Sequence, residues 1–258
     1  MNSCLWVLDA DHLQVGVFTS RREHTTTTVV CAGQRALVVD PAWDPDELGW
    51  IADDLAAAGL TVTAGFATHA HHDHVLWHPG FGDAPRWASP RCASTAAEQR
   101  MQLVAALGPG FPTQLAALVG RLSPVDQPVL TWTGAEVVLI THDAHAPGHT
   151  ALWLPTARVL IAGDMLSDVE LPLLEQSNPA DYAAGLAALR PYVEQALVVI
   201  PGHGSPAFGA AATGRWAADQ RYLDALHSPA APDDNRLALP GMAEAHFANR
   251  RQAAQSAT

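Results

Sequence analysis

The chain has 258 residues and a formal charge of −12, because 26 acidic residues face 14 basic ones, all of which are arginine. With 48% apolar and 16% charged residues, the composition is that of a packed globular protein and excludes a disordered one. An anionic chain without lysine is poorly suited to binding a phosphate backbone, so we expect no nucleic-acid partner. The length fits one large domain that can bury a substantial core.

The cysteines and the N-terminus bear on the compartment. Cys4, Cys31 and Cys92 lie far apart without a CxxC pair, which predicts neither a disulfide framework nor a cysteine-rich zinc site. The first residues lack the basic and apolar regions of a signal peptide, and no apolar run approaches the roughly 20 residues that span a bilayer. We therefore expect a cytoplasmic protein with no membrane partner.

Strand-like and helix-like patterns alternate along the chain. The expected strands cover 25–31, 35–40, 60–68, 136–140, 151–154, 158–162 and 196–200. The expected helices cover 44–58, which begins at Asp44 and Pro45, then 95–107, 112–122, 178–189, 213–226 and 240–255. This mixed order predicts one α/β layered domain over 1–228, with a helical insertion at about 92–122 and a C-terminal linker and helix over 229–258.

A dense group of histidines follows the strand expected at 60–68, where residues 69–74 read His-x-His-x-Asp-His. His69 and His71 are two residues apart, so on an extended backbone they project to the same side and can bind one ion. Asp73 and His74 follow as the chain turns, and they face a second position nearby. Imidazole and carboxylate groups at this density suit zinc, or another first-row metal, rather than calcium.

Three further segments each place a ligand type at the end of an apolar strand. They are Pro147-Gly148-His149-Thr150, Ala162-Gly163-Asp164 and Pro201-Gly202-His203-Gly204. Together with residues 69–74 and with Asp40 after an early strand, this ordered set resembles the motifs of the metallo-β-lactamase-fold hydrolases, over about residues 12–210. The resemblance implies an αββα sandwich in a single domain, with metals at one edge between the sheets.

The resemblance also implies two metal positions. The implied ligands of the first ion are His69, His71 and His149, those of the second are Asp73, His74 and His203, and Asp164 is the bridge. An aspartate rather than a cysteine at the bridging position is similar to the glyoxalase-II-type hydrolases. Asp40 is expected to orient a ligand histidine or its loop, with a buried carboxylate that caps the turn before Pro41 as the alternative.

Metal chemistry then suggests a reaction. Two zinc ions per chain, with iron or manganese as alternatives, would lower the pKa of a bound water toward about 7 and supply hydroxide at neutral pH. Asp73 would orient this nucleophile, which makes it the candidate catalytic residue. We expect a small-molecule substrate, and an ester, thioester or lactone is favoured.

Several alternatives stay open. The absence of lysine disfavours the glutathione thioesters, and Ser167 stands where the lactonase branch typically has a tyrosine. A β-lactam hydrolase, a mononuclear iron enzyme of the persulfide-dioxygenase type and a non-catalytic metal-binding protein are the other interpretations of the motif set.

Two tryptophans and the insertion are candidates for the surroundings of the site. Trp43 and Trp77 each follow a motif residue, so both are expected either to line an apolar pocket or to be plain core. The helices at 92–122 are expected to form a lid, a wall or a self-association surface, or simply to cover core. A homo-oligomer is therefore one expectation.

The remaining histidines near the motifs carry a weaker signal. His72 is the variable position of the motif and is expected to point away from the metals. His78, His142 and His145 are close enough in sequence to support the ligands or to line the pocket, but a hydrogen-bonded loop or surface histidine is the expectation for each.

Overall fold

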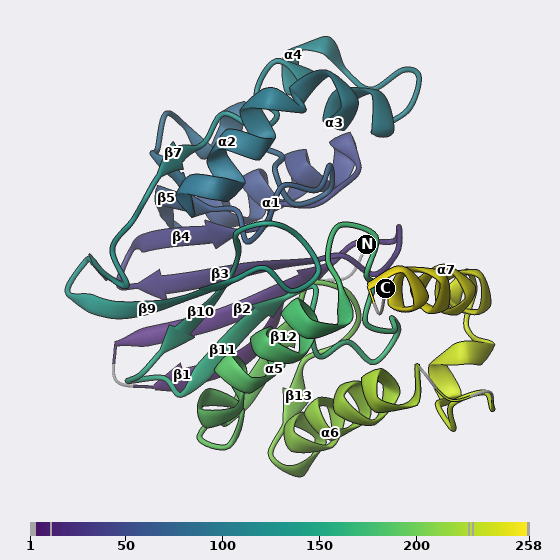
Figure 1. The fold of residues 1–258 in the computed structure, drawn as a ribbon. Helices are drawn as coiled ribbons and strands as arrows, with labels where there is room; N and C mark the ends of the chain where they lie inside the picture. Colours follow the sequence, from purple (N-terminus) through teal and green to yellow (C-terminus); the bar gives the residue numbers. More distant parts are fainter. Residues whose placement is uncertain (1–3, 11, 227, 229, 257–258) are drawn as a thin grey trace.

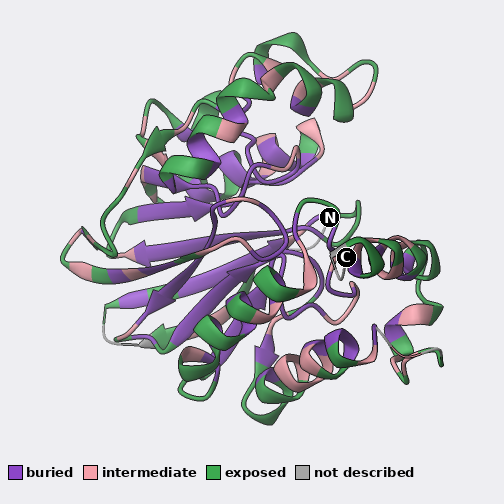
Figure 2. Cartoon of the chain, viewed as in Figure 1, coloured by how far each residue is buried: buried purple, intermediate pink, exposed green. Residues whose placement is uncertain are grey.

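Two β-sheets pack face to face, and helices cover the outer face of each (Figure 1). The structure is a computed structural model that describes residues 4–10, 12–226, 228 and 230–256. Its strands are mostly buried, whereas the helices expose their outer sides (Figure 2). The predicted αββα sandwich is thus confirmed.

The first sheet has the strand order β1-β2-β3-β4-β5-β6-β7. Its strands are β1 (Leu5–Ala10), β2 (Leu13–Thr19), β3 (Thr26–Ala32), β4 (Arg35–Val39), β5 (Thr61–Phe66), β6 (Arg86–Ala88) and β7 (Ser123–Pro124). Short turns connect β1 to β4, so these strands are antiparallel. From β4 onwards the neighbours are parallel, because helices lie in the connections from β4 to β5 and from β6 to β7.

The second sheet has the order β13-β12-β11-β10-β9-β8. Its strands are β8 (Val129–Trp132), β9 (Ala135–His142), β10 (His149–Leu154), β11 (Val159–Gly163), β12 (Val198–Pro201) and β13 (Ala207–Phe208). Every residue of β10 and β11 is buried, because the first sheet covers one face and helices cover the other. This double burial explains why both strands read as continuous apolar runs in the sequence.

Helices α1 to α4 lie on the side of the first sheet, and α5 and α6 on the side of the second (Figure 1). They are α1 (Pro45–Ala57), α2 (Pro90–Glu98), α3 (Arg100–Ala106), α4 (Thr113–Ala116), α5 (Pro179–Val193) and α6 (Ala210–Ala225). Short 3₁₀ turns occur at Pro79–Phe81 and Asn235–Ala238, and α7 (Met242–Ser256) ends the described chain. Among the described residues, no helix is both long enough and apolar enough for a membrane span.

The helices at 92–122 differ from the sequence prediction. The first begins at Pro90 rather than at Thr95, because the Ser89 side chain caps it by accepting a hydrogen bond from the Cys92 amide. The helix expected over 112–122 is only the short α4. It ends early because Gly120 adopts a φ of 65° and its amide donates to the Val75 carbonyl, which pulls the chain out of helical geometry.

The C-terminal segment packs on the second sheet side rather than lying loose on the surface. Asn249 of α7 is 2% exposed, and it accepts a hydrogen bond from the Leu174 amide and donates one to the Pro172 carbonyl. Residues 172–174 belong to the long connection between β11 and α5, so α7 is fastened to a loop that starts at the sheet edge. The domain boundaries themselves stay a prediction.

Candidate metal centre

The predicted ligand residues meet at one edge of the sandwich, where strands of both sheets end. Residues 69–74 follow β5 of the first sheet, whereas Asp164 follows β11 and His203 follows β12 of the second. The β9–β10 connection, residues 143–148, passes over the same edge. Two groups of ligand atoms form there, and Asp164 belongs to both.

Cluster 1 consists of His69, His71, His145 and Asp164. His71 Nδ1 lies 3.0 Å from His69 Nε2 and 3.1 Å from His145 Nε2. Asp164 Oδ2 lies 3.3 Å from His69 Nε2 and 3.2 Å from His145 Nε2. Ligand atoms bound at 2.0–2.1 Å to a tetrahedral zinc ion lie about 3.3 Å from one another, so this spacing fits one ion.

Cluster 2 consists of Asp73, His74 and His203, together with the same Asp164. His74 Nε2 lies 3.2 Å from Asp73 Oδ2 and 3.3 Å from His203 Nε2. Asp164 Oδ1 lies 3.2 Å from His74 Nε2, while its Oδ2 lies 3.3 Å from His203 Nε2. These distances fit a second tetrahedral ion equally well.

Asp164 is held between the clusters with unused hydrogen-bonding capacity. Its Oδ1 is buried and makes no well-directed hydrogen bond, although it faces His74 Nε2 at 3.2 Å. Such a buried carboxylate oxygen is well placed to bind a cation. Gly202 makes room for it, because a Cβ atom at that position would overlap Asp164 Oδ1. Burial alone would raise the pKa of Asp164, but His74, His203 and His69 outweigh burial and hold it well below its usual range.

The expected role of Asp40 as an orienting group agrees with the geometry. Its Oδ2 lies 3.1 Å from His74 Nδ1, which favours a proton on that nitrogen and leaves Nε2 free for a metal. The same carboxylate accepts hydrogen bonds from the amide and the hydroxyl of Thr68. Since the Thr68 hydroxyl donates to Asp40, it can accept from His69 Nδ1 at 3.0 Å and fix that ring as well.

The β2–β3 loop contributes partners that the sequence analysis missed. The Thr25 hydroxyl donates to Asp73 Oδ2 at 3.1 Å, and the Glu23 carbonyl accepts from His203 Nδ1 at 2.8 Å. Backbone bonds fasten this loop to the residues around His203, from the Thr26 amide to the Gly202 carbonyl and from the Gly204 amide to the His24 carbonyl. No motif marks these residues, because their roles arise from a contact between the two sheets.

His145, rather than His149, completes cluster 1, which corrects two expectations of the sequence analysis. His149 is the first residue of β10, paired in the ladder with His142, and its Nε2 accepts a hydrogen bond from the Asp164 amide at 3.1 Å. His145 lies in the preceding turn with a φ of 65°, an uncommon conformation that is concentrated at functional sites, and it is 3% exposed. The sequence did contain a sign of this difference. His149 begins an apolar run, and a residue in that position is held by the hydrogen bonds of a β-strand.

The two tryptophans lie in the core cluster beneath the first sheet. Trp77 is 3% exposed and donates from Nε1 to the Gly82 carbonyl. Trp43 is also buried, but its ring packs edge-on against His72 at 4.7 Å between centroids. His72 thus lies on Trp43 and outside both clusters.

The charges of the two clusters differ. Burial lowers the pKa of His69 to about 4 and that of His71 well below its usual value, so both rings are neutral. Burial also acts on His74 and His203, but the carboxylates around them outweigh it and raise both pKa values well above the usual range. Asp73 stays ionised, since its histidine neighbours outweigh burial and hold its pKa well below the usual value.

Glu170 is a further carboxyl group at this edge that the sequence analysis missed. Its Oε1 lies 3.8 Å from His203 Nδ1, and it can form a third group of ligand atoms with Asp164 and His203. Burial raises its pKa to about 7. No pattern in the sequence marks Glu170, because it lies in an irregular loop.

Comparison with known proteins agrees with the fold. The family model described as the metallo-beta-lactamase superfamily matches residues 21–209. The solved structure of metallo-β-lactamase IND-7 superposes with a TM-score of 0.64 at 16% identity, over 87% of this chain and 99% of that one. Metallo-β-lactamase FIM-1 from Pseudomonas aeruginosa, in its mono-zinc form, gives 0.63 at 13% identity, over 85% and 96%. DIM-1 metallo-β-lactamase gives 0.59 at 16% identity, over 85% and 98%.

A match of this extent means that the chain belongs to the metallo-β-lactamase superfamily. At these identities the similarity to solved structures shows the fold alone. The substrate and the metal ions must be argued from the site itself.

Proposed function

We propose that the chain is a binuclear zinc hydrolase that acts on a small ester, thioester or lactone. The carrying observation is the pair of clusters that share Asp164, with ligand atoms 3.0–3.3 Å apart in each. The donors are only imidazole nitrogens and carboxylate oxygens, which is the chemistry that zinc prefers. The buried Asp164 Oδ1, which makes no well-directed hydrogen bond and faces His74 Nε2 at 3.2 Å, is a further sign that cations belong here.

Cluster 1 and cluster 2 would each hold one ion. Zinc at such sites lowers the pKa of water to near 7 and polarises a carbonyl group, which suits hydrolysis at neutral pH. Asp73 directs Oδ2 into cluster 2, where the Thr25 hydroxyl holds it. Its Oδ1 lies 3.6 Å from His72 Nδ1 and would accept a hydrogen bond from an attacking water. Since Asp73 is ionised at neutral pH, it can accept a hydrogen bond from that water and orient it.

Other nucleophiles in the neighbourhood are unsuited to the reaction. Burial raises the pKa of the Cys92 thiol to about 12, and this side chain lies in the core beneath the first sheet. The Ser167 hydroxyl donates to the His203 carbonyl and accepts from the Val169 and Glu170 amides, so it caps a turn. Both residues have structural roles, and the mechanism uses neither as a nucleophile.

Elemental analysis and a substrate panel test the proposal together. Protein purified without chelator is expected to contain about two zinc ions per chain, and to hydrolyse at least one member of a panel of esters, thioesters, lactones and β-lactams. Removal of the metal should abolish the activity and added zinc should restore it. One firmly held iron per chain, with oxygen consumed on a persulfide, would instead identify the mononuclear dioxygenase.

A further inference from the structure

A cavity of about 570 Å³ lies beside cluster 2. Three segments that are far apart in the sequence line it: the β2–β3 loop, the loop after β11, and the chain just before α7. The lining residues are Glu23, His24, Val169, Glu170, Leu239, Pro240, Gly241 and Met242. The last four lie beyond residue 209, where the superfamily match ends, so this cavity depends on the C-terminal segment.

Two of the lining residues also contact His203, which connects the cavity to the metal centre. The Glu23 carbonyl accepts the hydrogen bond from His203 Nδ1 at 2.8 Å, and Glu170 Oε1 lies 3.8 Å from the same nitrogen. Both contacts are to Nδ1, the ring nitrogen opposite the Nε2 that faces cluster 2, so the cavity lies behind this residue. Glu170 lines the cavity and also groups with Asp164 and His203, which links the cavity to the edge of the metal centre. The volume falls within the range of about 300–1,000 Å³ that is usual for small-molecule sites.

The lining selects for apolar and against anionic groups. Val169, Leu239, Pro240 and Met242 provide apolar surface, and Leu239 is 36% exposed although it is a large aliphatic residue. No arginine is among the lining residues, while Glu23 and Glu170 bring carboxyl groups. An anionic group would find no basic partner of fixed charge there.

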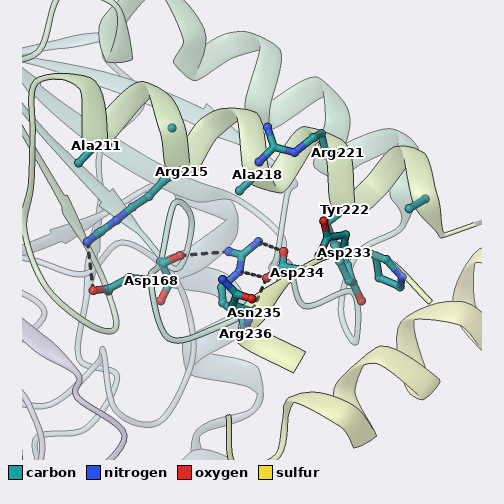
Figure 3. A pocket seen from close by; sticks show the side chains of 14 residues that line it. Asp168, Ala211, Arg215, Ala218, Arg221, Tyr222, Asp233, Asp234, Asn235 and Arg236 are labelled. Carbon is teal, nitrogen blue, oxygen red and sulfur yellow. Dashed lines mark hydrogen bonds and ion pairs between the residues drawn. The ribbon is translucent and has the colours of Figure 1, made fainter. Parts of the chain in front are cut away.

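The C-terminal wall is held firmly against the loop after β11. Arg236 Nη1 donates to the Ser167 carbonyl at 3.0 Å and to the Glu170 carbonyl at 2.8 Å. Figure 3 shows this side chain between α6 and the segment before α7, where it also pairs with Asp234. The Leu171 amide lies 3.3 Å from Met242 Sδ, its acceptor. The cavity is therefore preformed rather than dependent on a moving flap.

We propose that this cavity binds an uncharged hydrocarbon group of the substrate, such as the acyl chain of an ester, thioester or lactone. The proposal rests on the hydrolase function and deepens it, because it assigns the specificity for this chain to Leu239, Pro240 and Met242. It also makes the C-terminal segment a part of the substrate site.

Calorimetric titration of the zinc-loaded full chain with two amides tests the proposal. Octanamide has a neutral chain, and suberamic acid has a chain of the same length that ends in a carboxylate. Octanamide is expected to bind at least about tenfold more tightly, because a buried hydrocarbon end is favourable and a buried unpaired charge is not. Glu170→Gln should reduce the difference in affinity between octanamide and suberamic acid, since it removes a carboxyl group that would repel the carboxylate of suberamic acid.

Matched variants locate the binding. Leu239→Asp should weaken octanamide binding at least about tenfold, because it places a charge on the apolar wall. Pro240→Asp is a second variant at an exposed position and should act in the same direction. Phe247→Asp is the control, since Phe247 lies on α7 at 67% exposure and does not line the cavity. Thermal unfolding of each variant should stay close to that of the wild type, because all three positions are exposed.

The outcomes separate this proposal from the hydrolase function. Equal affinities for the two amides, or octanamide binding that ignores Leu239→Asp and Pro240→Asp, would overturn the cavity proposal even if esters are hydrolysed. Octanamide binding that depends on Leu239 supports the cavity as a hydrocarbon site even if no member of the substrate panel is turned over, in which case the hydrolase function alone fails.

Discussion

Cluster 1 and cluster 2 share one carboxylate, yet they differ in charge. Cluster 1 sets three histidines around Asp164, and burial keeps His69 and His71 neutral by lowering their pKa values. Cluster 2 has Asp73 as a second carboxylate, and Asp40 lies behind its His74. There the carboxylates outweigh burial, and the pKa values of the two histidines rise.

This difference in charge determines how the two clusters would bind zinc. A metal ligand must be an unprotonated imidazole nitrogen, so cluster 1 is ready for a cation at neutral pH. In cluster 2 the histidines carry protons that neutralise the carboxylates until a cation replaces them. We therefore expect zinc to bind at cluster 1 with little proton release, and at cluster 2 with the release of protons.

The largest expected effect comes from removing a ligand of cluster 2 only. Asp73→Ala should leave cluster 1 intact, so the zinc content should fall from about two to about one per chain. Hydrolysis should fall at least about 10²-fold, because the group that orients the nucleophile is lost. Elemental analysis of the purified variant measures the zinc content, and steady-state kinetics measure kcat. His72→Ala, one residue away, is the control and should change neither; equal behaviour of the two variants would contradict the assignment of the motif.

A second pair of variants separates ligand from support in cluster 1. His145→Ala should weaken zinc binding at cluster 1 by about 10²-fold, more than most losses of an orienting partner, and change the stability of the metal-free protein little. His149→Ala should keep two zinc ions but lower the free energy of unfolding by about 1–3 kcal/mol, because the buried Asp164 amide loses its acceptor. Competition with a chromophoric chelator and urea unfolding measure the two effects. The reverse pattern would assign the ligand role to His149.

A smaller effect is expected when an orienting group changes. Asp40→Asn keeps the shape of the side chain but weakens the hold on His74 Nδ1, so zinc affinity at cluster 2 should fall about 10–100-fold. A stepwise zinc titration by calorimetry resolves the two clusters. The zinc affinity of cluster 1 should fall less than that of cluster 2. An equal loss of affinity at both clusters would mean that Asp40 acts through the fold rather than through His74.

The smallest effect is a dependence of stability on pH. In the metal-free protein the raised pKa values of His74 and His203 stabilise the fold fully below the unfolded value of about 6.5, and this contribution is lost as the pH rises through the raised values. Zinc removes the need for these protons, so the increase in Tm caused by zinc should grow as the pH rises above about 6.5. Calorimetry at constant free zinc measures it, and an increase that shrinks with rising pH would contradict the charge difference between the clusters.

The sequence predicted most of the strands and helices of the sandwich. It also predicted six of the seven residues that form the two clusters, and the exception is His145. The motif at 69–74 was informative because its spacing alone places ligands on one strand end. Asp164 and His203 were predictable for a similar reason, since Asp164 directly follows a buried apolar strand and His203 lies two residues after another. Whether each residue holds a metal is a prediction that the measurements above must test.

What the sequence did not reveal depends on contacts between distant segments. His145 lies in a turn whose backbone conformation no sequence pattern predicts. It takes the place in cluster 1 that was predicted for His149, which instead pairs with β9 as the first residue of β10. Thr25 and Glu170 reach the clusters from loops on opposite sheets. The end of the helical segment at 112–122 was likewise set by a bond from Gly120 to Val75, which is 45 residues away in the chain.

The most direct test of the account is an anomalous-scattering map, measured at the zinc absorption edge on crystals of the zinc-loaded protein. The account predicts two peaks on either side of the Asp164 carboxylate, with His145 Nε2 at about 2.0–2.1 Å from the first and His74 Nε2 at a similar distance from the second. A single peak, or a first ion whose third histidine is His149, would contradict it.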